Sequence, residues 1–288
     1  MYNISIRKAT RNDFENIYSL ILNEHDNKNN VKEDWKNLFE NHWCKPDDFF
    51  GYVLIDNEII IGFLGTVFSY RMINNKLYKF CNLTTWVVNK EYRHSSIQLL
   101  FKVLKLKNIV FTAFTPSITA GAIYRALGFK EIENELIIIP FFLSLKSIFH
   151  KCIIEYREKI INEYLDKKEK IFFKDHLYYN CIYLLIKSFD GYCLIIGTRS
   201  KIKHIPFARI HYISNLTLFQ SYHSLVCLNV SLKFKVYGLI VEGRYLQNCK
   251  VSKLSIHRKL PFPTMYKSDL NEILEIDTLY SEFFLLNI

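Results

Sequence analysis

Hydrophobic and polar residues alternate with two different periods along the first half of this 288-residue chain. A two-residue period predicts strands at 3–10, 49–70, 78–88, 108–114 and 129–140. Apolar residues at helical spacing predict helices at 14–21, 97–104 and 120–127. Within 49–70, Asp56-Asn57-Glu58 is favourable turn chemistry and predicts a hairpin. Strands and helices that alternate in this order indicate an α/β fold.

The second half shows a similar pattern after a charged stretch. Residues 144–170 are rich in Lys and Glu and predict a helical connector. Strands are predicted at 179–189, 191–199, 207–214 and 236–243, with a helix at 224–235 before the last of them. The C-terminal stretch 276–287 has an apolar rhythm suited to a docking helix, with Asp277 and Glu282 available as polar contacts.

The pattern predicts a domain at 1–143, a connector at 144–170 and a second α/β domain at 171–288. The second domain resembles a faint copy of the first. Aligning Ser96 with Ser224 matches Leu100 with Leu228, and each helix then leads into a strand. Chance similarity in a chain rich in Leu and Lys is the alternative explanation.

Composition narrows the class of protein. Half of the residues are hydrophobic and 16% are aromatic, which is ample for a packed core and excludes a disordered chain. The net charge of +10 favours anionic partners such as nucleotide-like cofactors. Nucleic acid is disfavoured because the chain has no arginine-rich run and no aromatic RNA-binding motif. No zinc-type spacing is present, so we expect no metal.

Cysteine usage and hydropathy point to the cytoplasm. The seven cysteines stand alone, without a C-x-x-C pair, which predicts free thiols in a reducing compartment. The N-terminus begins as a strand and lacks the apolar core of a signal peptide. The most apolar segment, 136–149, is shorter than a membrane span and contains Pro140 and Lys146. We therefore expect a cytoplasmic protein without a membrane span.

One segment has the layout of a phosphate site. A strand ending in Val88 is followed by the polar loop 89–96 and by the helix that begins near Ile97. Amides at a helix N-terminus lack internal partners and lie at the positive end of the helix dipole, so they bind phosphate. Arg93 adds a fixed cation. The segment therefore predicts a pyrophosphate site.

The order of elements, with "VVNKEYRHSSIQLL" (87–100) and "AIYRALGFKEI" (122–132), resembles the GNAT superfamily of acyl-CoA N-acyltransferases over about residues 3–140. The resemblance implies a mixed, mostly antiparallel central sheet flanked by helices, followed here by the second α/β half. It implies acetyl-CoA or another acyl-CoA as co-substrate. The acceptor would be an amine or hydroxyl, such as a sugar amine, a peptide, a small amine or a polysaccharide precursor.

The resemblance also assigns roles to residues. Tyr124 matches the tyrosine that acts as general acid and protonates the departing thiolate. The pantetheine arm would pair with the strand at 86–88, and the loop amides would wrap the pyrophosphate. The cofactor-binding residues implied in this way are Trp86, Val87, Val88, Arg93, His94, Ser95, Ser96, Ile97, Gln98 and Ser117.

The chain departs from the family pattern at three places. The two loop glycines are replaced by Ser96 and Gln98, and Ser117 stands where an asparagine is common. The strand 79–88 carries no carboxylate, so the general base is unassigned. These departures favour two alternatives: a catalytically inactive binding or scaffold module, and an acyltransferase that uses an acyl-carrier protein.

Each candidate also has a structural interpretation. Tyr124 can be a packed core residue, and Ser95 and Ser96 can be helix N-caps. His94 and His211 can both be structural. The pair Glu24-His25 can hold a base, or His25 can simply favour the helix C-terminus.

Overall fold

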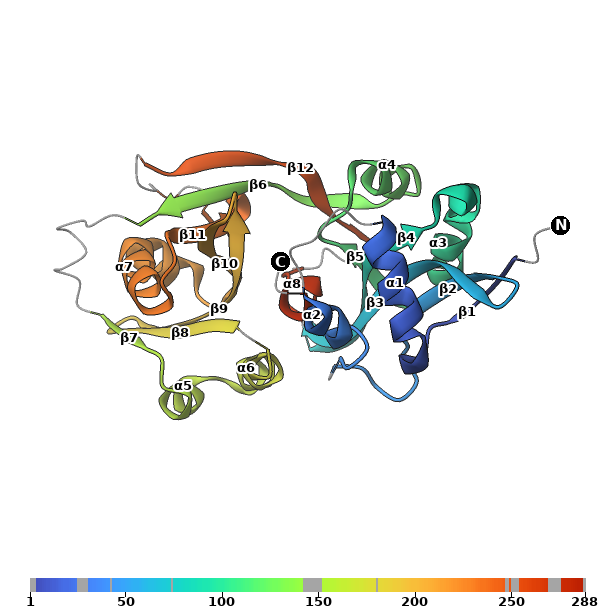
Figure 1. Cartoon of the computed structure of the whole chain (residues 1–288). Helices are drawn as coiled ribbons and strands as arrows, with labels where there is room; N and C mark the ends of the chain where they lie inside the picture. The colour runs from blue at the N-terminus through green and yellow to red at the C-terminus, as the bar shows by residue number, and fades with distance from the viewer. Residues whose placement is uncertain are drawn as a thin grey trace. The chain divides into compact units, whose positions relative to one another are not determined.

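The computed structural model describes residues 4–24, 31–41, 43–73, 75–141, 152–179, 181–246, 249, 254–268 and 276–286. These residues belong to two compact units (Figure 1). Unit 1 comprises Met1–Ile132, Thr264–Ile276 and Tyr280–Leu286. Unit 2 comprises Glu133–Pro263, Asp277–Leu279 and Asn287–Ile288. The start of the expected connector lies outside the described residues, and the expected domain boundaries stay a prediction.

Unit 1 is a mixed sheet with helices on both faces. Its strands are β1 (Ile4–Lys8), β2 (Gly51–Asp56), β3 (Ile59–Ile73), β4 (Lys76–Val88), β5 (Ile109–Ala113), the start of β6 (Lys130–Pro140) and the end of β12 (Ile256–Lys267). Its helices are η1 (Arg11–Asp13), α1 (Phe14–Glu24), α2 (Lys32–Asn37), η2 (Lys90–Ser95), α3 (Ile97–Leu104), α4 (Ile118–Ala126) and α8 (Glu282–Leu285). The strand order is β1-β2-β3-β4-β5-β12, and all neighbours are antiparallel except β4 and β5.

Side-chain alternation along β3 builds the two layers of unit 1. Leu64 and Phe68 pack in the core that α3 and α4 close, while Phe63 turns to the other face and stacks on Phe39 below α1. Figure 1 shows α1 over β3 and β4, with α3 and α4 on the opposite side. The hairpin turn between β2 and β3 is as expected, because Asn57 and Glu58 both have positive φ, as a two-residue turn of the I′ type requires.

Unit 2 is built from the remaining strands. It contains β6, β7 (Ile153–Glu155), β8 (Cys181–Ser188), β9 (Gly191–Ile202), β10 (Ile205–Ile213), β11 (Gly238–Glu242) and the first part of β12. Its helices are α5 (Glu158–Tyr164), α6 (Lys167–Leu177), α7 (Leu216–Phe234) and η4 (Gly243–Leu246). The strand order is β6-β11-β10-β9-β8-β7. Helix α7 packs on one face, whereas aromatic side chains of α6 contact Tyr183 and Tyr212 on the other.

The two units share one pairing pattern. In unit 1, β2, β3 and β4 pair antiparallel in sequence, and after α3 the chain returns as β5 parallel to β4. In unit 2, β8, β9 and β10 pair antiparallel, and after α7 the chain returns as β11 parallel to β10. This agreement supports the second, GNAT-like half that the sequence indicated.

Three details differ from the sequence expectations. Helix α7 begins at Leu216 rather than near 224, because Asn215 caps it by accepting a hydrogen bond from the Leu218 amide at 3.1 Å. Helical spacing placed Phe101 on the apolar stripe of the helix predicted at 97–104, but Phe101 is exposed, since α3 directs Leu99, Leu100 and Val103 into the core instead. The described part of the connector includes the short strand β7 as well as helices.

The seven cysteines are free thiols, and burial raises the pKa of Cys193 to about 12. Within the described ranges, no helix is both long and apolar enough to cross a bilayer. The first residues of the apolar segment 136–149 form the end of β6, and most of the remainder lies outside the described residues.

Candidate functional site

The candidate site lies where strands β4 and β5 of unit 1 separate. We call this opening between the two strands the fork. β4 pairs with β5 from Lys79, opposite Ile109, to Asn82, opposite Thr112. Beyond Asn82, β4 continues to Val88 and no longer pairs with β5. In the part of the chain that the structure describes, no other strand takes the place of β5 there. The edge of β4 over residues 83–88 can therefore accept an extended ligand by strand addition.

A β-bulge lies in the open part of β4. Thr84 is opposite Gly65 and Trp86 is opposite Leu64, so that Thr85 is an extra residue without a partner on β3. Its φ of 50° is unusual for a β-branched residue. A bulge interrupts the ladder and redirects backbone groups. Gly65 allows this close approach, since a Cβ there would lie 3.1 Å from the Thr84 carbonyl oxygen.

The predicted phosphate loop forms a 3₁₀ helix that leads directly into α3. The amide of Ser96 donates to the carbonyl of Arg93 at 3.1 Å, so this amide is used within the loop. Ser96 is the N-cap of α3 but makes no side-chain capping bond, and Ser95 is buried; the capping interpretation therefore fails for Ser96. Ile97 and Gln98 follow in the first turn of α3, and Gln98 is exposed.

Charge at the loop is partly compensated. Arg93 and His94 are exposed, and the Arg93 guanidinium lies 3.4 Å from the Glu24 carboxylate at the end of α1. Most of the Arg93 side chain, 63%, stays accessible to solvent. The Arg93 guanidinium is therefore accessible to a phosphate, but it already interacts with the Glu24 carboxylate. His25, the other member of the Glu24-His25 pair, lies outside the described residues.

Helix α4 forms the other side of the fork. Ser117 is its N-cap, and the Ser117 hydroxyl accepts a hydrogen bond from the Ala120 amide at 3.2 Å. Gly128, with φ of 82°, ends the helix directly after the predicted helical stretch 120–127. Lys267 of β12 donates to the Leu127 carbonyl at 2.6 Å, which caps the same end.

Tyr124 is buried between two aromatic rings. Its ring stacks on Trp86 at 5.9 Å between centroids and packs on Phe129 at 4.9 Å. Burial raises the pKa of Tyr124 well above its ordinary value, and the negative charge of Glu282 raises it further. The structure thus places Tyr124 beside Trp86 at the open edge of β4, and its role as general acid stays a prediction. The indole NH of Trp86 is buried and has no hydrogen-bond partner among the described residues.

Glu282, expected from the sequence only as a polar contact of the C-terminal helix, lies at the base of the fork. Its side chain accepts hydrogen bonds from Asn82 of β4 and, at 2.7 Å, from Thr115 just after β5. A carboxylate is therefore present beside the strand that itself lacks one. Nothing in the local sequence could reveal this, because 200 positions separate Asn82 from Glu282.

A buried histidine lies at the bulge of β10 in unit 2. His211 is the extra residue of β10, between the pairs of Ile210 and Tyr212 with β9. Its ring bonds to Thr198 at 2.9 Å and to Thr278 at 2.7 Å. Complete burial lowers the pKa of His211 well below its ordinary value, so the ring is neutral and structural. The predicted cofactor residues all belong to unit 1.

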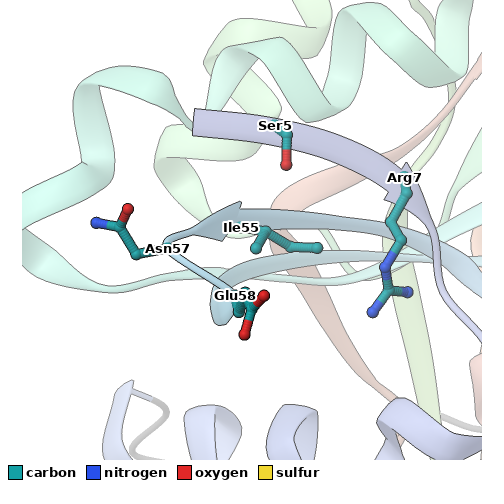
Figure 2. A pocket seen from close by; sticks show the side chains of 5 residues that line it. All are labelled: Ser5, Arg7, Ile55, Asn57 and Glu58. Atoms are coloured by element: carbon teal, nitrogen blue, oxygen red, sulfur yellow. The ribbon is translucent and has the colours of Figure 1, made fainter. Parts of the chain in front are cut away.

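A shallow hollow of about 640 Å³ lies elsewhere on unit 1. Figure 2 shows its lining: Ser5 and Arg7 on β1, Ile55 on β2, and Asn57 and Glu58 at the hairpin turn. It contains none of the predicted site residues, and Arg7 is already bonded to Asp13. Among the described residues, no group of three or more His, Cys, Asp and Glu side chains could hold a metal ion.

Comparison with solved structures identifies the fold. A GCN5-related N-acetyltransferase from Anabaena variabilis superposes with a TM-score of 0.59 at 12% sequence identity. The match covers 92% of this chain and 72% of the Anabaena protein. A GCN5-related N-acetyltransferase from Kribbella flavida superposes with a TM-score of 0.58 at 10% sequence identity. The match covers 92% of this chain and 71% of the Kribbella protein. No protein-family model and no curated protein sequence matches the chain.

A third match is the GCN5-related glucosamine N-acetyltransferase region of a fungal multi-domain β-N-acetylglucosaminidase. It matches 93% of this chain and 38% of its own, at 10% identity and a TM-score of 0.61. At such identities the likeness shows the fold alone. The expectation of a GNAT fold, with a mixed, mostly antiparallel sheet flanked by helices, is confirmed, and the fold extends over both units.

Proposed function

We propose that this protein is an acyl-CoA-dependent acyltransferase, most simply an N-acetyltransferase, that acts by direct attack of an amine or hydroxyl in a ternary complex. The observation that carries the proposal is the fork between β4 and β5, with a bulge at Thr85 and Tyr124 beside its open edge. The fold of solved N-acetyltransferases supports the same activity.

The residues at the fork fit an acyl-CoA. The free edge of β4 at Trp86, Val87 and Val88 offers backbone groups to the amides of a pantetheine arm. Arg93, with His94 and the amides of residues 95–98, lies at the helix N-terminus, where a pyrophosphate is favoured. The loop supplies fewer free amides than a glycine loop, because Ser96 already bonds to Arg93. Ser117 would face the ligand from the start of α4.

Two groups would carry the chemistry. A backbone amide at the Thr85 bulge is suited to polarise a thioester carbonyl, because a bulge frees backbone groups from the ladder. Tyr124 would give its proton to the departing CoA sulfur. Its raised pKa keeps the phenol protonated at neutral pH, but burial also makes the phenol a weaker acid than free tyrosine.

A catalytically inactive binding module is the second candidate. Gln98 places a long side chain on the first turn of α3, and the ion pair between Glu24 and Arg93 partly neutralises the cation that phosphate needs. In this case the fold would be kept for binding a partner. Absence of acyl-CoA binding would distinguish this candidate from the first.

Titration calorimetry with acetyl-CoA tests the proposal. We expect binding by the natural protein at millimolar ligand or below. Arg93→Ala should weaken binding about tenfold, as loss of one charge-assisted hydrogen bond predicts. Lys102→Ala, which removes an exposed cation further along α3, is the matched control and should leave the affinity unchanged. No binding at millimolar acetyl-CoA would contradict the acyltransferase.

A further inference from the structure

The C-terminal segment Tyr280–Leu286 is part of the core of unit 1. Figure 1 shows α8 against α2, where the Asn37 side chain donates to the Leu285 carbonyl at 3.0 Å. Tyr280 packs on Trp43 at 5.0 Å between ring centroids. The other residues of the C-terminal segment are almost completely buried: Ser281, Glu282, Phe283, Phe284, Leu285 and Leu286. The segment is therefore held in one place by packing.

A carboxylate stands in the middle of this apolar segment. Glu282 is 0% exposed. Removing a carboxylate from water costs several kcal/mol unless its surroundings compensate, and the neighbouring Phe and Leu side chains would dock the helix without it. The buried carboxyl group of Glu282 thus requires an explanation beyond docking.

The hydrogen bonds of Glu282 connect both arms of the fork. One carboxylate oxygen accepts from Asn82 Nδ2, and the other accepts from Thr115 Oγ1 at 2.7 Å. Asn82 is also fixed, because its Oδ1 accepts a bond of 3.2 Å from Thr112 across the last pair of β4 and β5. The carboxylate is therefore oriented at the point where the two strands separate.

Thr115 links this buried group to the surface. Glu282 itself is inaccessible, but Thr115 is exposed at the end of the same hydrogen bond. A hydroxyl can accept a proton from a bound molecule while it passes its own proton to the carboxylate. The pair Thr115–Glu282 thus has the geometry of a proton relay that leads inward from the fork.

We propose that Glu282 is the proton acceptor of acyl transfer and that Thr115 is the group that contacts the acceptor. This inference rests on the proposed function. As the acceptor nitrogen bonds to the acyl carbon, its proton passes to Thr115 Oγ1, and the Thr115 proton passes to Glu282. The carbon–sulfur bond then breaks, and the sulfur takes the Tyr124 proton. Glu282 then returns its proton through Thr115 to solvent, and the Tyr124 phenolate takes a proton from solvent, which restores the starting state.

The relay also couples the two ends of the reaction. The negative charge of Glu282 is one of the causes that raise the pKa of Tyr124. Once Glu282 takes the acceptor proton, that charge is gone and the phenol becomes a stronger acid. Proton uptake at Glu282 therefore prepares Tyr124 for the step that follows.

The test uses acetyl-CoA with hydroxylamine as a small acceptor, with release of the CoA thiol as the measured rate. Glu282→Gln should lower kcat about a hundredfold, as expected for loss of a general base, and leave the acetyl-CoA dissociation constant within about twofold. Thr115→Val, which keeps the volume but removes the hydroxyl, should give a similar loss. Thr115→Ser restores the hydroxyl and should restore the rate.

These variants separate the inference from the proposed function. A natural protein that neither binds acetyl-CoA nor transfers the acetyl group would overturn both. A natural protein that is active, with Thr115→Val equally active, would overturn the relay and leave the acyltransferase intact. If Glu282→Gln does not fold, the comparison of Thr115→Val with Thr115→Ser still decides, because Thr115 lies on the surface.

Discussion

The side-chain amide of Asn82 donates a hydrogen bond to the carboxylate of Glu282, which lies 200 positions further along the chain. This bond brings an acidic group to a strand whose own sequence has none between residues 79 and 88. The candidate site therefore depends on the C-terminal segment as well as on the strands and helices that the N-terminal sequence encodes.

Tyr124→Phe tests the assignment of the general acid. The ring contacts with Trp86 and Phe129 remain possible for phenylalanine, so acetyl-CoA affinity and stability should change little. Turnover should fall about a hundredfold if the hydroxyl donates the proton. Steady-state kinetics and calorimetry together measure both quantities. Tyr52→Phe, at another buried tyrosine, is the matched control and should keep full turnover.

An unchanged rate in Tyr124→Phe would show that Tyr124 serves only as a packed core residue. A lower affinity with an unchanged turnover number would indicate a role in holding Trp86 rather than in proton transfer. Neither result would affect the fold.

Glu24→Gln tests whether Arg93 is a phosphate contact. The substitution removes an anion 3.4 Å from the guanidinium and so frees Arg93 for the ligand. Exposed ion pairs contribute up to about 1 kcal/mol, so acetyl-CoA should bind about two- to fivefold more tightly in calorimetry. Glu15→Gln removes another carboxylate of α1, which pairs with Lys32, and should have no effect. An unchanged affinity in Glu24→Gln would place the pyrophosphate away from Arg93.

Two glycines of the α4 region should respond in opposite directions to alanine. Gly121 lies inside the helix, and a Cβ there would meet Pro116 only at an ordinary contact of 3.9 Å. Gly121→Ala should therefore raise the free energy of unfolding by about 0.5–1 kcal/mol. Gly128 has a left-handed φ of 82°, so Gly128→Ala should lower it by about 1–2 kcal/mol. Urea unfolding measures both, and changes of the same sign would contradict the observed helix end.

Asp13 gives the stability of unit 1 a defined dependence on pH. Hydrogen bonds from Arg7, followed by those of Thr10, lower the pKa of Asp13 from 3.8 to about 2. The folded state thus favours the charged form, and its stabilisation is complete above the unfolded pKa and lost as pH falls from about 4 to about 2. Because Arg7 is half-exposed, screening reduces the contribution to about 1 kcal/mol.

The measurement compares Asp13→Asn with the natural protein by urea unfolding. The difference in unfolding free energy should be about 1 kcal/mol near pH 7 and smaller near pH 3. Asp47→Asn, at an exposed aspartate, should show almost no difference at either pH. A difference for Asp13→Asn that does not change with pH would contradict the ion pair.

Local hydrophobic patterns in the sequence predicted most of the strands and helices. Alternation along 49–70 predicted the hairpin of β2 and β3, because one face of each strand is buried and the turn residues accept positive φ. Apolar residues at helical spacing over 120–127 predicted α4, because one face of this helix is buried. Such signals lie within a few residues of each other, so they can be recognised without knowledge of the rest of the chain.

The features that the sequence did not reveal depend on long-range contacts. β12 contains Pro261 and Pro263, which obscure a strand signal, and its pairing with β5 joins Met265 to Ala113. The exposure of Phe101 depends on which side of α3 faces the sheet. The position of Glu282 depends on the packing of α8 against α2, which no local pattern encodes.

A crystal structure of the protein with CoA tests the central claim most directly. We predict that the pantetheine arm pairs with the edge of β4 at 83–88 and that the pyrophosphate lies beside Arg93. The sulfur should lie within hydrogen-bond distance of the Tyr124 hydroxyl, at the fork where Asn82 and Thr115 hold Glu282. CoA bound elsewhere, or an edge of β4 at 83–88 that stays unoccupied at saturating CoA, would contradict this placement.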